Sequence, residues 1–163
     1  MVMAVRVLVT GMSGNGKSSA LVALGELGHR VVETDGAGWW EPRFDGTEYD
    51  RFWREDRIAA LLAEENERTL FVSGTVPNQG RFYDRFDAVV LLSAPEEVVL
   101  ERVAARTEHD FGKRPGEREK IRRDLAEVEP LLRAGATHEI DTRRPLTKVV
   151  DELVAIAQEF RTQ

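Results

Sequence analysis

A glycine-rich segment, GMSGNGKSS at residues 11–19, separates an apolar run from a helical pattern and limits the folds open to this chain. The run before it, AVRVLVT at 4–10, has the nearly continuous apolar character of a strand that is buried on both faces. The pattern after it predicts a helix that starts near Lys17 and stops at Gly28. A strand, a tight loop and a helix in this order predict the first unit of a parallel α/β fold.

The residue types of this loop suit a polyphosphate. Gly11, Gly16, Lys17 and Ser18 satisfy the pattern G-x-x-x-x-G-K-[ST] at every specified position. Glycine lets backbone N–H groups approach phosphate oxygens closely, and the following helix adds its unpaired N–H groups and its dipole. The alternative is a strand-to-helix turn that needs glycine for geometry alone, and the preceding strand and following helix favour the phosphate site. The predicted nucleotide contacts in the loop are Gly11, Ser13, Gly14, Asn15, Gly16, Lys17, Ser18 and Ser19.

Apolar runs and helical patterns continue to alternate along the chain, which indicates βαβ units around a parallel sheet. The further predicted strands cover residues 30–34, 69–74, 87–93 and 138–142. Four further helices are predicted. The first covers about 50–65, and the second opens with a Ser93/Glu96 capping box and ends near Arg106. The third has Ile121, Leu125, Val128 and Leu132 on one face, and the fourth covers 146–160.

Composition excludes several kinds of site. The 163 residues contain no cysteine, which rules out disulfides and thiolate chemistry, and a net charge of −6 does not favour nucleic acid as a partner. The apolar stretch near the N-terminus is too short for a membrane span, so we expect a cytoplasmic protein, as a monomer or homodimer, with no membrane partner.

With its glycine loop, an acidic residue after the second strand and an arginine-rich segment after the fourth, the chain resembles the small P-loop kinases of the nucleoside-monophosphate-kinase superfamily, which includes adenylate, shikimate and gluconate kinases. The resemblance covers nearly the whole chain. It implies a single domain over 1–163, a three-layer αβα sandwich with five parallel strands in the order 2-3-1-4-5. It also implies a small helical acceptor insert at about 36–66 and a lid at about 107–119.

Asp35 directly follows the second predicted strand, at the sheet edge where ligands bind in open α/β sheets. A carboxylate there can accept a proton from an attacking hydroxyl or hold Mg²⁺, for which the Ser18 hydroxyl is the second predicted ligand. It resembles the substrate-site aspartate of shikimate kinases. The alternative is a turn residue, since Asp-Gly is a common turn.

Arginines of the predicted lid region are the candidates for stabilising the charge of a transferring phosphoryl group. Arg106 and Arg114 are predicted to act in catalysis together with Lys17 and Asp35, and Arg102 and Arg106 to contact the nucleotide. The interleaved acidic residues leave a salt-bridged surface as the alternative.

The acceptor is predicted from the insert and from the loop after the third strand. The predicted acceptor contacts are Asp35, Arg43, Arg54, Gly74, Thr75 and Gln79. Trp53 is predicted to pack the insert onto the domain. Two departures from the family matter: Ser73-Gly74 stands where adenylate kinases carry Asp-Gly, and Val128 stands where shikimate kinases carry an arginine, which argues against shikimate as the acceptor.

The resulting hypothesis is an ATP- and Mg²⁺-dependent kinase for a small-molecule acceptor, with a nucleotide or nucleoside first and a hydroxylated metabolite next. The alternative is a nucleotide-binding regulatory module with slow hydrolysis or none. Phosphorylation of a nucleic acid is the weakest reading, because of the net charge.

Overall fold

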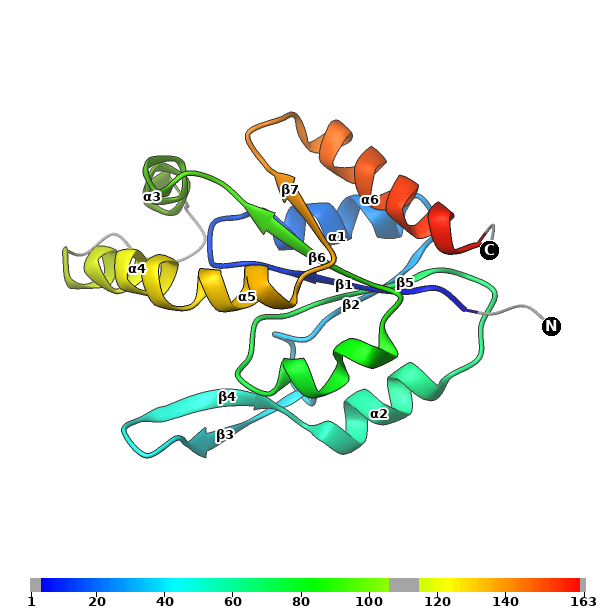
Figure 1. The fold of residues 1–163 in the computed structure, drawn as a ribbon, viewed down its shortest axis with the longest axis horizontal. Coiled ribbons are helices and arrows are strands. Elements are labelled where there is room, and N and C mark those ends of the chain that lie inside the picture. Colours follow the sequence, from blue (N-terminus) through cyan, green and yellow to red (C-terminus); the bar gives the residue numbers. More distant parts are fainter. Residues whose placement is uncertain (1–3, 106–114, 162–163) are drawn as a thin grey trace.

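The computed structural model describes residues 4–105 and 115–161, which form a parallel sheet between two layers of helices (Figure 1). The sheet has the strand order β2-β5-β1-β6-β7. The strands are β1 (Arg6–Thr10), β2 (Arg30–Glu33), β5 (Leu70–Ser73), β6 (Ala88–Ser93) and β7 (His138–Asp141). Counted over these five strands, this is the predicted order 2-3-1-4-5, and the predicted α/β sandwich is confirmed.

The two faces of the sheet have separate cores because successive side chains of a strand point to opposite sides. On one face, Val7 and Val9 of β1 pack with α1 (Lys17–Glu26) and α6 (Leu146–Arg161). On the other face, Leu8 packs with α2 (Glu55–Ala63) and the 3₁₀ helix η1 (Gln79–Arg85). The central strand is therefore buried from Val7 to Thr10, which explains its nearly continuous apolar sequence.

The insert departs from the helical one that was expected. It begins with an antiparallel hairpin of β3 (Trp40–Phe44) and β4 (Tyr49–Trp53), so the helix starts at Glu55 and not near residue 50. The turn is stabilised by Asp45, whose carboxylate accepts from the backbone N–H groups of Thr47 at 2.8 Å and Glu48 at 2.9 Å. Aromatic residues on both sides of this turn favour strands over helix, and this was the missed signal.

The helices beyond β6 also differ in detail from the prediction. α3 (Glu96–Ala105) is present, but the Ser93 hydroxyl donates to Glu139 at 2.7 Å and forms no capping box. The single helix predicted around Val128 is two helices, α4 (Pro115–Glu127) and α5 (Glu129–Gly135), which are separated at Val128. Pro130, in the first turn of α5, explains the break, because it has no N–H with which to continue the helical hydrogen bonds across Val128.

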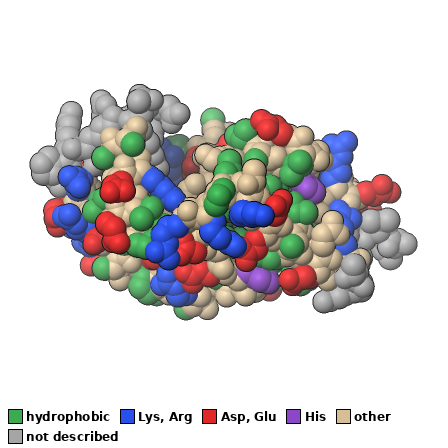
Figure 2. Space-filling view, turned by 90° about the horizontal axis from the view of Figure 1, so that it is seen from above, with side chains coloured by type: hydrophobic (Ala, Val, Ile, Leu, Met, Phe, Trp, Pro, Cys, Tyr) green, Lys and Arg blue, Asp and Glu red, His purple; other side chains and the backbone are tan. Residues whose placement is uncertain are grey.

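On the face seen in Figure 2, Lys and Arg side chains are interspersed with Asp and Glu side chains. Within residues 4–105 and 115–161, no helix has the length and apolar character needed to cross a membrane.

Candidate functional site

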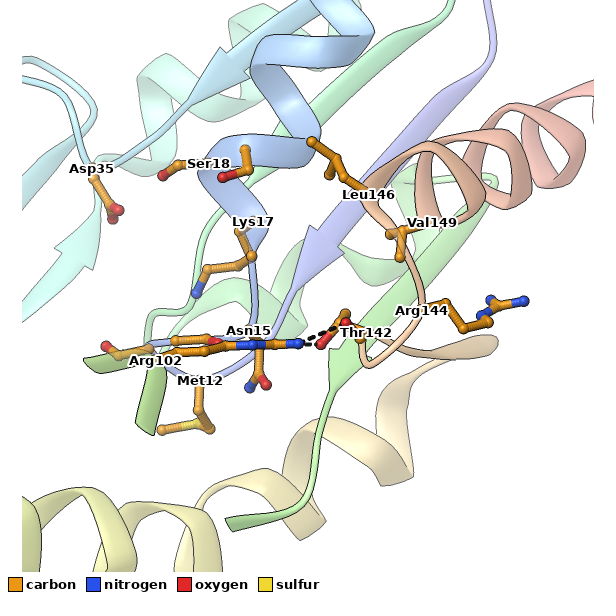
Figure 3. Close-up of a pocket in the computed structure, with 14 residues that line it drawn as sticks. Met12, Asn15, Lys17, Ser18, Asp35, Arg102, Thr142, Arg144, Leu146 and Val149 are labelled. Carbon is orange, nitrogen blue, oxygen red and sulfur yellow. Dashed lines mark hydrogen bonds between the residues drawn. The ribbon is translucent and has the colours of Figure 1, made fainter. Parts of the chain in front are cut away.

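A cleft of about 620 Å³ opens at the end of the sheet where β1 leads into the glycine-rich loop (Figure 3). Residues 12–19 form one wall. The other lining residues are Asp35, Arg102, Thr142, Arg144, Leu146 and Val149. Together with residues 12–19, these come from four separate stretches of the chain, which the fold brings together near the carboxyl ends of the strands.

Glycine is required at two points of the loop. Gly11 has φ +151°, and a Cβ there would lie 2.5 Å from the carbonyl oxygen of Leu92. Gly14 has φ +86°, and its Cβ would lie 3.1 Å from side-chain atoms of Val99 and Val103 in α3. The loop therefore fits closely against β6 and α3. The α1 helix then begins at Lys17 without a side-chain cap, so its first-turn N–H groups face the cleft as an anion site.

The Lys17 side chain turns back over the loop. Its ammonium group donates to the hydroxyl of Thr75 at 2.9 Å and to the carbonyl oxygen of Gly11. A positive charge is thereby held beside the N-terminus of α1, which is the position that the sequence motif predicts for a phosphate-binding lysine.

Asp35 lies on the same side of the cleft as Ser18 and Lys17 (Figure 3). The Trp40 indole N–H donates to the Asp35 carbonyl oxygen at 3.1 Å, which fixes the loop after β2, while the carboxylate itself is exposed. The Ser18 hydroxyl and the Asp35 carboxylate are hard oxygen donors of the kind that Mg²⁺ prefers alongside phosphate oxygens, so they fit the predicted metal. Among the residues that the structure describes, no three His, Cys, Asp or Glu side chains form a metal cluster by themselves.

Asn15, a predicted nucleotide contact, lies beneath the loop. Its side chain is completely buried, and within the described part of the chain neither amide atom has a hydrogen-bond partner. A buried amide without a hydrogen-bond partner costs free energy, so packing alone does not explain why an asparagine stands at position 15.

Arg102, a predicted nucleotide contact, lines the cleft, and its guanidinium group holds the walls of the cleft together. It donates to the Gly14 carbonyl oxygen at 3.2 Å and to the hydroxyl and carbonyl oxygens of Thr142 at 2.8 and 2.7 Å. The Thr142 hydroxyl in turn donates to the Ser93 carbonyl oxygen at 3.1 Å. Arg102 therefore ties the glycine loop to the turn that follows β7.

That turn is the part of the cleft that sequence reasoning missed. Thr142 and Arg144 come directly after β7, and Leu146 and Val149 belong to the first turns of α6. Arg143 donates to the carboxylate of Asp141 and lowers the pKa of Asp141 to about 2, so the turn begins with a well-formed ion pair. The available signal was the rule that had pointed to Asp35, since β7 ends at the same edge of the sheet.

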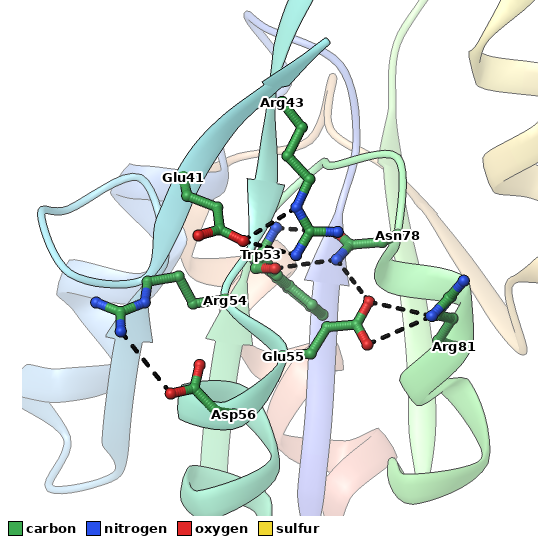
Figure 4. Close-up of polar contacts among 8 residues, drawn as sticks. All are labelled: Glu41, Arg43, Trp53, Arg54, Glu55, Asp56, Asn78 and Arg81. Carbon is green, nitrogen blue, oxygen red and sulfur yellow. Dashed lines mark hydrogen bonds and ion pairs between the residues drawn. The ribbon is translucent and has the colours of Figure 1, made fainter. Parts of the chain in front are cut away.

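The predicted acceptor contacts are dispersed. Arg43 pairs with Glu41 at 2.6 Å and Arg54 with Asp56 at 3.8 Å (Figure 4), and neither arginine lines the cleft. Their role in acceptor binding stays a prediction.

Three further acceptor candidates, Gly74, Thr75 and Gln79, follow β5. A Cβ on Gly74 would lie 2.5 Å from the Thr34 hydroxyl and 3.0 Å from the Trp53 ring, so this glycine makes room for packing. Gln79 is 2% exposed, and its amide bonds the backbone N–H of Val76 and the side chains of Thr10 and Tyr83. Thr75 faces Lys17, as described above.

Trp53 is completely buried, which confirms its predicted packing role. Its indole N–H donates to the Thr34 hydroxyl at 2.8 Å, and its backbone is bonded on both sides to the Asn78 amide (Figure 4). Arg106, Arg114 and most of the predicted lid lie outside the described residues.

Comparison with known proteins agrees with this geometry. The model of a family described as an AAA domain matches residues 7–124. A nucleotide-binding protein of Gluconacetobacter diazotrophicus is 30% identical over 139 residues, which are 83% of this chain and 36% of that protein. The chain thus spans about a third of the length of this relative.

Solved structures show the same fold over nearly the full chain. A shikimate kinase from Acinetobacter baumannii, in complex with shikimate, superimposes with a TM-score of 0.67 and 18% identity, over 98% of this chain and 96% of that one. A gluconokinase from Sinorhizobium meliloti 1021 gives a TM-score of 0.59 and 22% identity, over 99% and 96%. The predicted resemblance to the small P-loop kinases is thereby confirmed for the fold, with the subfamily unassigned.

Proposed function

This chain belongs to the AAA-domain family that matches residues 7–124, and we propose that it is an ATP- and Mg²⁺-dependent phosphotransferase for a small-molecule acceptor. The observation that carries the proposal is the position of the Lys17 ammonium, beside the uncapped N-terminus of α1 and above a loop with three positive-φ glycines. Backbone N–H groups, a helix dipole and one cation converge there on the volume that a triphosphate would fill.

The reaction transfers the γ-phosphoryl group of ATP to an acceptor hydroxyl. A bond forms between the hydroxyl oxygen and the γ-phosphorus, the bond from that phosphorus to the β-bridging oxygen breaks, and ADP leaves. Lys17 supplies positive charge where negative charge develops on the phosphate chain. Asp35 is the group in the cleft that can take the hydroxyl proton, on a carboxylate oxygen. Mg²⁺, held by Ser18 and Asp35, would neutralise phosphate charge.

A nucleotide or nucleoside is the first candidate acceptor, with a hydroxylated metabolite next. The insert beside Asp35 carries arginines stacked on aromatic rings: the Arg51 guanidinium lies 4.3 Å from the Trp40 ring centre and that of Arg57 5.1 Å from the Trp39 ring centre. Planar rings and cations in one place suit an acceptor with a planar ring and an anionic group. A screen of labelled ATP against nucleotides, nucleosides and sugar acids tests this.

The central experiment compares Lys17→Ala with Lys148→Ala, which removes an exposed lysine of α6. We expect acceptor-dependent label transfer to be lost in Lys17→Ala and kept in Lys148→Ala, while both variants unfold thermally as the wild type does. Near-normal transfer by Lys17→Ala would refute the proposal.

A second candidate is a nucleotide-binding regulatory module. It is favoured by Ser73 and Gly74 at the end of β5, where the resemblance to adenylate kinases would place a carboxylate. Such a module would bind Mg·ATP and release phosphate slowly, with no labelled acceptor in the screen.

A further inference from the structure

The hydroxyl group of Thr75 occupies a specific position beside the P-loop lysine. Parallel pairing of β1 with β5 sets Val9 opposite Ser73, and two residues further this register brings Gly11 opposite Thr75. The hydroxyl donates to the Gly11 carbonyl oxygen at 2.6 Å, while the Gly11 N–H approaches it at 3.3 Å. It also accepts a 2.9 Å hydrogen bond from the Lys17 ammonium.

Thr75 is itself held by a buried hydrogen-bond chain. Its hydroxyl lies 3.2 Å from that of Thr10, which accepts from the Gln79 amide at 3.0 Å. The same amide donates to the Tyr83 hydroxyl at 2.9 Å. Thr10 is 0% and Gln79 2% exposed, so these groups have little freedom to rearrange.

A positioned lysine has a physical advantage in phosphoryl transfer. Its long side chain loses rotamer entropy when it is immobilised. A side chain that is already held when the nucleotide arrives has met much of this cost, and its charge stands where the transition state needs it.

We propose that Thr75 is the positioning residue for the Lys17 ammonium. The loop after β5 then contributes to phosphoryl transfer through the Thr75 hydroxyl, which holds Lys17, and not through a contact between Thr75 and the acceptor. This inference rests on the proposed function. It also gives Gln79 and Thr10 a role, because they hold the Thr75 hydroxyl in place.

The test uses binding, so that it does not depend on knowing the acceptor. Calorimetry of the full chain with Mg·ADP and with the non-hydrolysable analogue Mg·AMP-PNP gives the preference for a γ-phosphate as a ratio of Kd values. Thr75→Val keeps the shape of the side chain and removes the hydroxyl. Thr75→Ala also removes the hydroxyl and, being smaller, cannot overpack the site. Thr75→Ser keeps the hydroxyl. Thr137→Val is the matched control, because Thr137 bonds the backbone N–H and carbonyl of Val89 at the opposite end of the sheet.

We expect Thr75→Val and Thr75→Ala to lower the triphosphate preference about tenfold, the scale of losing a hydrogen bond to a charged group. Thr75→Ser should restore the preference and Thr137→Val should leave it unchanged, even where thermal unfolding shows that Thr137→Val is destabilised. A preference that survives in Thr75→Val and Thr75→Ala overturns the inference, and so does a loss that serine fails to rescue.

Lys17→Ala separates failure of the inference from failure of the proposed function. If the preference is lost in Lys17→Ala but kept in both hydroxyl-free variants, the positioning role of Thr75 is wrong and the phosphate site stands. If the wild-type protein binds neither nucleotide, or prefers neither, both proposals are wrong.

Discussion

The guanidinium of Arg102 is bonded twice to Thr142, at 2.8 Å to its hydroxyl and 2.7 Å to its carbonyl oxygen, and reaches the Gly14 carbonyl oxygen from the same side. One side chain of α3 therefore joins the phosphate loop after β1 to the turn after β7. These two segments form opposite walls of the cleft (Figure 3), so the width of the cleft depends on this link.

Replacing Arg102 by methionine should loosen both walls while keeping most of the side-chain volume. We expect the free energy of unfolding to fall by about 1.5–3 kcal/mol, as for hydrogen bonds to a charged group, and nucleotide affinity to fall with it. Urea denaturation and calorimetry with Mg·ADP measure the two effects.

Arg85→Met is the matched control for this change, since Arg85 is exposed and makes one long contact of 3.4 Å to the Ala59 carbonyl oxygen. It should shift stability by less than about 0.5 kcal/mol. Equal effects of the two substitutions would contradict the role given to Arg102.

Gly74→Ala probes the packing at the end of β5. The added Cβ would meet the Thr34 hydroxyl at 2.5 Å and Trp53 at 3.0 Å, where the two residues share a buried hydrogen bond. Overpacking of this kind costs about 1–3 kcal/mol, and tryptophan fluorescence should report the displaced ring during unfolding. Gly36→Ala, whose Cβ would have ordinary contact at 3.5 Å, should be close to wild type, and a similar loss there would remove the packing explanation.

Asp35→Asn tests the proposed proton acceptor. Loss of a general base lowers transfer about 10²- to 10⁴-fold, so we expect labelled transfer to the acceptor found by screening to fall in that range. Affinity for ADP measured without Mg²⁺ should stay close to the wild-type value. Asp50→Asn, on the exposed hairpin, serves as the control, and unchanged transfer by Asp35→Asn would exclude the proton role.

His29 should make stability depend on pH. Partial burial and, second, the charge of Arg161 lower the pKa of His29 below 6.5, and its ring lies edge-on to Phe71 at 5.4 Å. Between the folded-state pKa and 6.5 the unfolded chain binds more protons, so stability is full above pH 6.5 and decreases as the pH falls through that window. Urea midpoints from pH 7.5 downwards (about one point per half unit) should show this decrease and its loss in His29→Gln. If the urea midpoints of the wild type and of His29→Gln fall equally with pH, the decrease in stability comes from groups other than His29.

The five strands of the sheet and most helices were predictable, because buried parallel strands leave nearly continuous apolar runs and amphipathic helices leave periodic ones. The order of the strands came from the resemblance to the small P-loop kinases. The hairpin 40–53 was not predicted, although its aromatic residues favour strands, because the pairing of Trp40 with Trp53 depends on a turn at Asp45–Gly46. The break at Val128 was missed because apolar spacing remained in register across Pro130.

For the site, the sequence by itself determined the phosphate loop, since its requirements are local: glycines that allow positive φ, and a lysine at the start of a helix. It also placed Asp35, because a residue at a strand end lies at a known edge of the sheet. Only the tertiary structure decided that Thr75 meets Lys17, that Arg102 joins Gly14 to Thr142, and that the turn after β7 closes the cleft. These contacts join segments up to 88 residues apart, and they depend on strand register and helix placement, which a local pattern of residue types does not encode.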